Sequence, residues 1–389
     1  MGLRLGDATG HAMTALLPQT WLNAGRPPQH LVLRWFFFIF LRVLGGAALI
    51  LPDAAMAQDA PMPPAQTVRF PSSDGKTTLT GYLYDPFGAG PHPAIILLHG
   101  RAGLYSARIN GTCTQVGPAI PSPCDAGTLS ARHLDWTRYW LARGYVVLLV
   151  DSFGPRGVAH GFGRYTHGSP ERAATNELTV RPLDAEGALQ WLATRSEVDV
   201  RRIMLQGWSN GASTALNVMQ RQAARPSGDS PSFAAALVFY PGCGKQALLS
   251  SHPELDKPVQ VLLGSADEEV SPATCQRVLR QAIPVRQAPP PMVTVYTGAT
   301  HDFDDPGRVR QSIQANRAAR EEARSRVGPW LDRITPRALP PSKTTSTACS
   351  VVRSRIDWGS FSGTRPHPPW SVARSTQFIP INANKKGSA

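Results

Sequence analysis

A serine stands at the centre of the motif Gly-Trp-Ser-Asn-Gly at residues 207–211. The apolar run at residues 203–206 predicts a strand directly before it, and a helical pattern begins directly after it. A tight strand-to-helix turn of this kind lifts the hydroxyl of Ser209 above a sheet, where it can attack a carbonyl carbon. Gly207 and Gly211 are needed because a side chain at either position would collide with neighbouring backbone. The motif therefore predicts a nucleophile.

An acid that orients the base of such a nucleophile is expected later in the chain, before the base itself. Three carboxylates, Asp267, Glu268 and Glu269, follow the predicted strand at residues 258–263. Asp267 is the predicted acid, because it comes first after the turn and its short side chain would hold an imidazole closely. Glu268 and Glu269 are the alternatives for this role, and otherwise we expect them to be solvated neighbours.

The base is expected after the next predicted strand, at residues 292–296, where His301 lies in the sequence Gly-Ala-Thr-His-Asp-Phe. An imidazole suits this task because its ordinary pKa is close to neutral pH. His301 is therefore the predicted general base. Asp302, Asp304 and Asp305, which follow it, are interpreted as loop or helix-start residues.

Acyl transfer also needs N–H donors that point at the developing oxyanion. One predicted donor is the backbone N–H of Asn210, directly after the nucleophile. The second is expected in the loop at residues 99–103, where the N–H of Arg101 is the first candidate and that of Ala102 the second. His99 is expected to pack and to form hydrogen bonds within this loop.

A scaffold must position these residues, and strand and helix patterns alternate between residues 67 and 334. Several strands are continuous apolar runs, as expected for strands that are buried on both faces. Repeated strand–helix units predict an α/β fold with a mostly parallel central sheet, helices on both faces and a site at the carboxyl ends of the strands. The predicted strands are 67–70, 79–85, 93–98, 145–150, 202–207, 234–240, 258–263 and 292–296, and the predicted helices are 131–142, 183–192, 212–222 and 312–334.

Residues 67–334 resemble an α/β-hydrolase of the dienelactone hydrolase family. The resemblance rests on an ordered set of pieces: residues 99–103, 151–157 and 207–211, the turn with Asp267, and His301-Asp302-Phe303. It implies Ser209 as nucleophile, His301 as base and Asp267 as acid, in agreement with the reading above. It also implies a small-molecule ester or lactone substrate, with no cofactor and no metal. The dienelactone hydrolases that name the family use cysteine as nucleophile, so the serine favours a general carboxylic ester hydrolase.

Two other functions are compatible with the same fold. A peptidase would need a site that admits an amide and protonates an amine, and nothing in the sequence excludes it. A binding module could retain the turn without turnover, but such a module has no reason to keep all three catalytic positions.

Two residues are candidates for contact with the substrate. Arg156, in the run at residues 151–157, either binds a substrate carboxylate through its planar guanidinium or forms a structural ion pair, for which Asp151 is a candidate partner. Trp208, next to the nucleophile, is the second candidate.

A glycine-rich loop at residues 157–168 holds His160 and His167. Neither histidine has an obvious third partner for a metal, so no metal site is predicted there. The loop is interpreted as a mobile lid.

The composition of the 389 residues, 42% hydrophobic and 17% charged, excludes a collagen-like repeat, a coiled coil and a fully disordered chain. The net charge of +13 includes +2 from residues 1–57 and +7 from residues 335–389, which leaves +4 for residues 58–334. Because the central part is only mildly basic, its charge gives no reason to expect a nucleic-acid partner. The sequence does not indicate an oligomeric state.

Three parts are predicted along the chain. Residues 1–57 are an N-terminal extension with a signal peptide, whose final Ala-Met-Ala fits the small-x-small cleavage rule. Cleavage after Ala57 predicts export to the periplasm or the exterior without membrane attachment, whereas an uncleaved segment would anchor the protein in the membrane. Residues 58–334 are the α/β-hydrolase domain, and residues 335–389, rich in Pro, Ser, Thr and Arg, are a disordered tail.

Four cysteines, Cys113, Cys124, Cys243 and Cys275, lie in the predicted domain, and Cys349 lies in the tail. Their spacing fits neither a CxxC motif nor a zinc site. In an exported protein the first four are expected to form two disulfides, with free buried thiols as the alternative. The sequence leaves the connectivity open.

Overall fold

The computed structural model describes residues 62–164, 166, 168–226, 228 and 230–335. The predicted signal peptide, the cleavage after Ala57, the predicted tail and Cys349 lie outside the described residues. The chain divides into two units, Met1–Gly328 and Pro329–Ala389, and the sheet and the site described below belong to the first. The boundaries expected at residues 57 and 334 stay predictions.

An eight-stranded sheet has the order β1-β2-β4-β3-β5-β6-β8-β10. β2 pairs antiparallel with β1 and with β4, and all the other neighbours are parallel. The mostly parallel sheet is therefore confirmed, with an antiparallel edge. The strands are β1 (Gln66–Pro71), β2 (Thr78–Tyr84), β3 (His92–Leu98), β4 (Val146–Asp151), β5 (Val198–Trp208), β6 (Ala235–Phe239), β8 (Val259–Gly264) and β10 (Met292–Tyr296), while β7 (Glu254–Leu255) and β9 (Ile283–Pro284) form a separate parallel pair.

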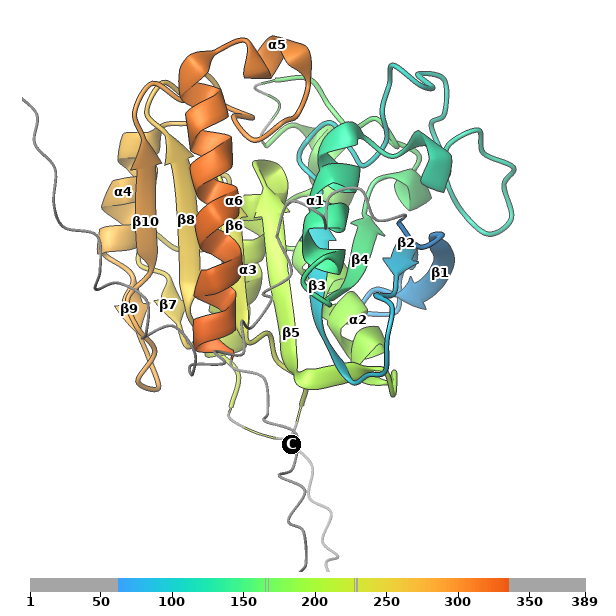
Figure 1. Cartoon of the computed structure of the whole chain (residues 1–389), viewed down its shortest axis with the longest axis horizontal. Helices are drawn as coiled ribbons and strands as arrows, with labels where there is room; N and C mark the ends of the chain where they lie inside the picture. Colours follow the sequence, from blue (N-terminus) through green and yellow to red (C-terminus); the bar gives the residue numbers. More distant parts are fainter. Residues whose placement is uncertain (1–61, 165, 167, 227, 229, 336–389) are drawn as a thin grey trace, which may run out of the picture. The chain divides into compact units, whose positions relative to one another are not determined.

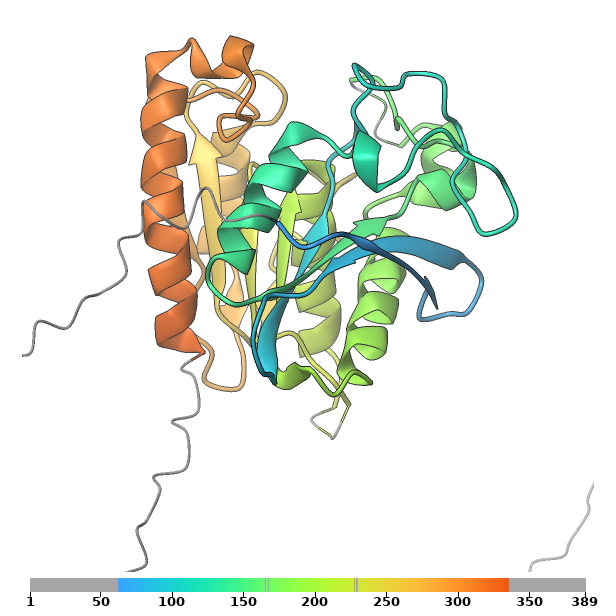
Figure 2. The same ribbon diagram turned by 45° about the vertical axis from the view of Figure 1, so that its right-hand side comes forward.

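Helices cover both faces of the sheet (Figure 1). α1 (Ala131–Leu141) and α6 (Gln314–Ile334) lie in front of it, and α2 (Arg181–Ala193), α3 (Asn210–Ala223) and α4 (Pro272–Arg280) lie behind it. The helices behind the sheet share one apolar cluster with the strands, to which Leu189, Leu216 and Leu279 belong. The turned view in Figure 2 shows the same two layers of helices. The shorter helices are η1 (Ala126–Thr128), η2 (Gly154–Arg156), η3 (Pro170–Thr175) and α5 (Arg308–Gln311).

All eight strands and four helices predicted from the sequence are present. Every residue of β4 is buried, as is every residue of β3 except His92, as their continuous apolar runs predicted. The sequence analysis missed α4, although its buried side chains, Cys275, Val278 and Leu279, lie at helical spacing and Ser271 caps its start. Within the described residues, no helix is both long and apolar enough to span a membrane.

The topology brings three loops to one edge of the sheet. β5, β6, β8 and β10 are neighbours and parallel, so their carboxyl ends lie together. Ser209 follows β5, Asp267 follows β8 and His301 follows β10. The sheet therefore collects residues that are far apart in the sequence.

Candidate active site

Ser209 occupies a strained turn between β5 and α3. Its φ is 50°, a left-handed value that residues with a side chain rarely adopt. Its N–H donates to the carbonyl oxygen of Phe239 at 2.9 Å. A Cβ on Gly207 would collide with the carbonyl of Gly211, and a Cβ on Gly211 would collide with the carbonyl of Leu98. The predicted need for both glycines is confirmed, because backbone closes in on the turn at both positions.

His301 bridges Ser209 and Asp267. Its Nε2 lies 3.0 Å from Oγ of Ser209, and its Nδ1 lies 2.8 Å from Oδ2 of Asp267. Oδ1 of Asp267 accepts the backbone N–H groups of Glu269 and Val270 at 2.8 and 2.9 Å, which fixes the carboxylate. When Nδ1 donates its proton to Asp267, Nε2 of the neutral ring can accept the hydroxyl proton of Ser209. The structure thus brings together the three residues that the sequence selected.

The surroundings of His301 favour its protonated form. The side chains of His301 and Asp267 are 2% and 1% exposed. Burial by itself would lower the pKa of His301, but the hydrogen bond to Asp267 and the charges of Asp302, Asp267 and Glu269 raise it above its ordinary value. An imidazolium that forms here is therefore stabilised by the site.

The loop after β3 passes beside the nucleophile. A Cβ on Gly100 would lie 3.5 Å from the Cβ of Ser209, so the backbone that leads to Arg101 runs close to the serine. In the described part of the chain, the N–H of Arg101 donates no hydrogen bond. The N–H of Asn210 belongs to the first turn of α3, where the helix itself offers no acceptor. The role of these two groups as oxyanion donors stays a prediction.

A buried arginine that the sequence analysis missed joins the two sides of this region. Arg181, at the start of α2, donates to the carbonyl oxygen of His99 at 2.8 Å and to the side chain of Asn210. Burial lowers the pKa of Arg181 to about 10, which leaves its guanidinium charged at neutral pH. His99 itself bonds to the carbonyl of Gly100 at 2.8 Å through Nδ1, so its predicted bonding within the loop is confirmed. An arginine followed by proline gives no sequence signal of burial, and the fold alone reveals this contact.

A model of the dienelactone hydrolase family matches residues 127–335, just over half of the chain. The chain belongs to the dienelactone hydrolase family. It is accordingly a hydrolase of ester bonds, of the carboxylesterase type. The order of the strands and the helices on both faces agree with the α/β-hydrolase fold that the sequence predicted.

Individual proteins are similar to the chain at low sequence identity. An uncharacterized protein of Mycobacterium tuberculosis is 27% identical over 252 residues, which are 62% of this chain and 74% of that protein. An esterase of Pyrococcus furiosus is 19% identical with a TM-score of 0.46, over 69% of this chain and 92% of its own. Esterase 2 of Thermogutta terrifontis is 20% identical with a TM-score of 0.47, over 72% of this chain and 98% of its own. A dienelactone hydrolase-like promiscuous phosphotriesterase from metagenomic libraries is 18% identical with a TM-score of 0.48, over 70% of this chain and 99% of its own.

In this dienelactone hydrolase family protein, Glu268 is exposed, as expected of a solvated neighbour, whereas the side chain of Glu269 is only 8% exposed. Oε2 of Glu268 accepts the backbone N–H of His301 at 2.9 Å. Glu269 accepts Nε and Nη2 of Arg101, both at 3.0 Å, and pairs with Nε of Arg164 at 2.8 Å. For Glu269 the expectation is wrong, because the turn after β8 faces the loops after β3 and η2, a proximity that only the fold creates.

Arg156 holds a structural ion pair. Its two terminal nitrogens each donate to Asp184 at 2.8 Å, and one of them also donates to the carbonyl oxygen of Ser152. Asp151, the partner considered from the sequence, instead accepts two backbone N–H groups and the hydroxyl of Tyr105. Of the two alternatives for Arg156, the ion pair is therefore the one present, with a different carboxylate.

Trp208 lies in the core rather than at the surface of the site. Its side chain is fully buried and stacks on Phe239, and its Nε1 donates to Oδ2 of Asp304 at 2.8 Å. Successive side chains of a strand point to opposite faces, and at this position β5 directs the indole toward Trp136 of α1. The prediction that Trp208 contacts the substrate is therefore wrong, because its side chain is fully buried in the core.

Asp304, interpreted from the sequence as a loop residue, is a fully buried acceptor. It accepts the indole N–H groups of Trp136 and Trp208 at 2.7 and 2.8 Å and the hydroxyl of Tyr240. Burial raises its pKa, although the charge of Arg132 and these hydrogen bonds oppose the rise. One carboxylate thus ties together donors from α1, β5 and the loop after β6.

A cavity of about 520 Å³ includes Glu269 in its wall, but not Ser209, Asp267 or His301. Glu269 forms part of its wall and also places Oε2 3.8 Å from Nε2 of His301. The rest of the wall comes from residues 242–247, 270, 271 and 274. Glu269 is therefore the residue that links this cavity to His301.

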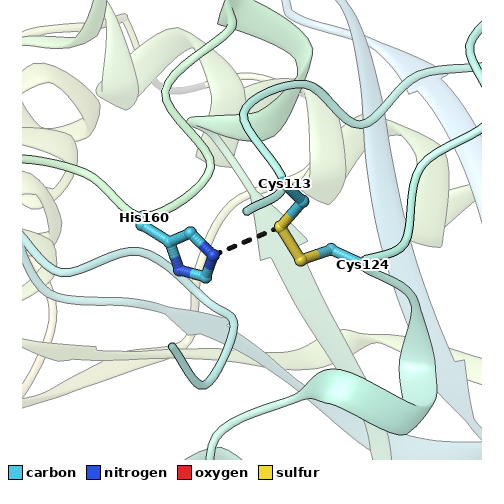
Figure 3. A group of neighbouring side chains, drawn as sticks. All are labelled: Cys113, Cys124 and His160. Atoms are coloured by element: carbon cyan, nitrogen blue, oxygen red, sulfur yellow. Dashed lines mark hydrogen bonds between the residues drawn. A yellow bond between two sulfur atoms is a disulfide. The ribbon is translucent and has the colours of Figure 1, made fainter. Parts of the chain in front are cut away.

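Two disulfides join Cys113 to Cys124 and Cys243 to Cys275. The expected two disulfides are therefore present, and the four cysteines are not free thiols. Their pairing is the connectivity that the sequence left open. Nε2 of His160 lies 3.3 Å from Sγ of Cys113 (Figure 3). These three residues are close enough to share a metal ion, but sulfurs that are bonded to each other offer no thiolate ligand.

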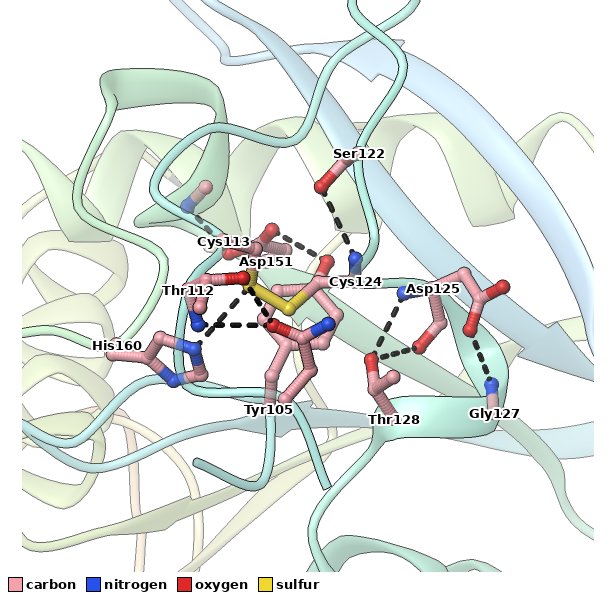
Figure 4. Close-up of a disulfide and its surroundings, with 12 residues drawn as sticks. Tyr105, Thr112, Cys113, Ser122, Cys124, Asp125, Gly127, Thr128, Asp151 and His160 are labelled. Carbon is pink, nitrogen blue, oxygen red and sulfur yellow. Dashed lines mark hydrogen bonds between the residues drawn. A yellow bond between two sulfur atoms is a disulfide. The ribbon is translucent and has the colours of Figure 1, made fainter. Parts of the chain in front are cut away.

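The loop that the first disulfide closes is fastened to its surroundings (Figure 4). Within the loop, Oγ of Ser122 accepts the N–H of Cys124 at 3.2 Å, and directly after the loop Oδ1 of Asp125 accepts the N–H of Gly127 at 2.8 Å. The N–H of Ala159, next to the histidine in Figure 3, donates to the carbonyl of Thr114 at 2.8 Å. Phe162 then donates to the carbonyl of Arg101 at 3.0 Å. The segment interpreted as a lid is therefore bonded at two points in this structure.

Proposed function

We propose that this protein hydrolyses a carboxylic ester or lactone through an acyl-enzyme on Ser209. The observation that carries the proposal is the position of His301, with Nε2 at 3.0 Å from Ser209 Oγ and Nδ1 at 2.8 Å from Asp267 Oδ2. A serine–imidazole–carboxylate chain of this geometry activates a hydroxyl that is otherwise a weak nucleophile.

In the first half of the reaction, Oγ of Ser209 attacks the acyl carbon and its proton passes to Nε2 of His301. Asp267 stabilises the imidazolium and keeps the ring in the tautomer that presents Nε2. The N–H groups of Asn210 and Arg101 hold the oxyanion of the tetrahedral intermediate. When the intermediate collapses, the leaving alkoxide takes the proton from His301, and the acyl group stays on Ser209.

In the second half, water attacks the acyl carbon and gives a proton to Nε2 of His301. The second tetrahedral intermediate expels Oγ of Ser209, which takes that proton back. The products are the carboxylic acid and the alcohol, or a hydroxy acid when the substrate is a lactone. The cavity of about 520 Å³ whose wall includes Glu269 is the proposed site for a small organic substrate, for which its volume is large enough.

We also propose that the protein is exported. The signal-peptide pattern that ends at Ala57 supports this location. Two disulfides support it as well, since such bonds persist mainly in oxidising compartments. N-terminal sequencing of the protein secreted by its host tests the proposal, and a mature chain that starts at Gln58 is expected.

Hydrolysis of p-nitrophenyl acetate, butyrate and octanoate by the full chain tests the reaction. Ser209→Ala should lower kcat/KM by at least about 10³-fold, as loss of a triad nucleophile does. Ser213→Ala is the matched control, because Ser213 lies one turn further along α3 and its hydroxyl donates to the carbonyl of Gly242 at 2.9 Å. That variant should keep its activity within a few-fold. A fluorophosphonate should label the wild type and Ser213→Ala but not Ser209→Ala.

Equal turnover by the wild type and Ser209→Ala would refute the mechanism. Labelling of Ser209 without hydrolysis of any of the three esters would instead keep the nucleophile and exclude simple aryl esters as substrates.

A further inference from the structure

Glu269 is a carboxylate of the site that the mechanism above does not use. Its side chain is 8% exposed. Two arginines bind it, Arg101 through two nitrogens at 3.0 Å and Arg164 through Nε at 2.8 Å. Burial alone would raise the pKa of Glu269, but the hydrogen bonds and the charge of Arg101, together with His301, hold it below its usual value, so the carboxylate is ionised.

One oxygen of Glu269 faces the atom that receives the proton from the nucleophile. Oε2 lies 3.8 Å from Nε2 of His301, which is too far for a hydrogen bond but close for two charges. Asp267 contacts the other nitrogen of the ring at 2.8 Å. The imidazolium would therefore form between two carboxylates, one at each nitrogen.

The same oxygen connects the base to the loop beside the nucleophile. Oε2 of Glu269 accepts Nε of Arg101 at 3.0 Å, and Oε1 accepts Nη2 at 3.0 Å. A bidentate pair of this kind fixes the orientation of a guanidinium as well as its distance. Arg101 is also the residue whose backbone N–H is the proposed oxyanion donor. Glu269 thus contacts both the base and the side chain of the residue that would carry this donor.

We propose that Glu269 is a positioning residue of the active site, which stabilises the positive charge on His301 during proton transfer and fixes the loop that carries Arg101. This inference rests on the proposed hydrolytic mechanism. Glu269 adds to the triad and does not replace Asp267, because it lies on the side of the ring that faces Ser209.

Several charged groups face His301 besides Glu269. Asp267 bonds Nδ1, Asp302 follows His301 in the chain, and Glu268 accepts the backbone N–H of His301. The ring of Tyr240 packs on the imidazole with centroids 4.6 Å apart. Arg132 and Arg310 offset part of this negative charge, since both pair with Asp302. The contribution of Glu269 is therefore one of several, and Arg101 and Arg164 reduce it further.

The pH dependence of kcat/KM for p-nitrophenyl acetate separates this role from a structural one. Removing the negative charge in Glu269→Gln lowers the pKa of His301, so the acid limb should move to lower pH by about one unit. The activity on the plateau should fall about tenfold, because the imidazolium loses a stabilising charge. Removing the positive charge in Arg164→Gln leaves Glu269 less neutralised, so the acid limb should move to higher pH. If the ion pair of Glu269 and Arg164 only held loops together, the two variants would not be expected to shift the acid limb in opposite directions.

Glu186→Gln is the matched control. Glu186 is also a carboxylate bound by two arginines, Arg221 and Arg225, at 2.8 and 2.9 Å, and its side chain is 7% exposed. It lies on α2, and the mechanism gives it no part. The acid limb of this variant should coincide with that of the wild type.

Coincident acid limbs for the wild type and Glu269→Gln, or shifts of Glu269→Gln and Arg164→Gln in the same direction, would overturn the inference and leave the mechanism intact. If Glu269→Gln fails to fold, Arg164→Gln decides alone, since Arg164 is 44% exposed and its loss is tolerable. An acid limb of Arg164→Gln that does not rise then overturns the inference. If Ser209→Ala turns over as fast as the wild type, the mechanism fails first and the inference fails with it.

Discussion

Replacing Asp304 by asparagine should destabilise the protein strongly, although Asp304 lies outside the proposed catalytic triad. The carboxylate is fully buried and accepts three hydrogen bonds, from Trp136, Trp208 and Tyr240. Asparagine has nearly the same shape, so the variant removes charge and one acceptor oxygen without opening a cavity. Arg132 keeps Asp302 and Asp305 as partners at 2.8 and 3.0 Å.

The expected loss follows from the difference between charged and neutral hydrogen bonds. A hydrogen bond to a charged group contributes about 1.5–3 kcal/mol and a neutral one about 0.5–1.5 kcal/mol, so each of the three bonds loses about 1 kcal/mol. The variant also recovers part of the cost of burying a carboxylate, a cost that appears as the raised pKa of Asp304. The net loss in free energy of unfolding should be about 2–3 kcal/mol. A domain with a stability of about 5–15 kcal/mol remains folded after this loss.

Urea denaturation followed by far-UV circular dichroism measures the effect, with Asp305→Asn as the control. The side chain of Asp305 is 34% exposed and pairs with the same arginine, so its loss should cost at most about 1 kcal/mol. Activity should also fall in Asp304→Asn, because Trp208 precedes the nucleophile and Tyr240 packs on the base. A loss below about 0.5 kcal/mol, or equal losses in the two variants, would refute the reasoning.

Two further predictions concern stability. Burial raises the pKa of Asp151 from 3.8 to about 6, so the folded state binds this proton more tightly than the unfolded state does. Stability from this group is present at low pH and is lost as the pH rises from about 4 to 6, by about 3 kcal/mol in total. Unfolding free energies at pH 4 and 7 should therefore differ less in Asp151→Asn than in the wild type, and equal pH slopes would contradict this. Replacing both cysteines of a disulfide by serine should cost about 4 kcal/mol for Cys243–Cys275, which closes 32 residues, and about 3 kcal/mol for Cys113–Cys124, which closes 11. Urea denaturation under oxidising conditions measures both losses, and the reverse order would contradict the loop-entropy argument.

The hydrogen-bonded chain of Ser209, His301 and Asp267 could be predicted because each of its members carries a local signal. Ser209 is marked by two glycines at fixed spacing, and Asp267 and His301 are marked by the strands that they follow. Parallel strands bring their carboxyl ends to one edge of the sheet. The position of each residue after a strand was therefore sufficient to predict that the three residues lie together. α4 was missed although it carries a local signal too, because Cys275, Val278 and Leu279 are spaced as on one face of a helix.

Contacts between side chains of distant loops had no such signal. Arg101 and Glu269 are 168 positions apart, as are Trp136 and Asp304, and their contacts depend on the paths of the loops. The burial of Trp208 and the ion pair of Arg156 depend on the direction in which each side chain leaves the backbone. The type of a residue does not reveal this direction.

The sequence by itself determined the family, the eight strands of the main sheet, four of the helices and the three residues of the proposed triad, because these depend on local spacing and on the handed, parallel connection of strands. The tertiary structure alone decided which charges surround them. Asp304 became a buried acceptor, Arg181 a buried donor and Glu269 a neighbour of the base, because desolvation and pairing are set by what packs against a side chain and not by its position in the chain.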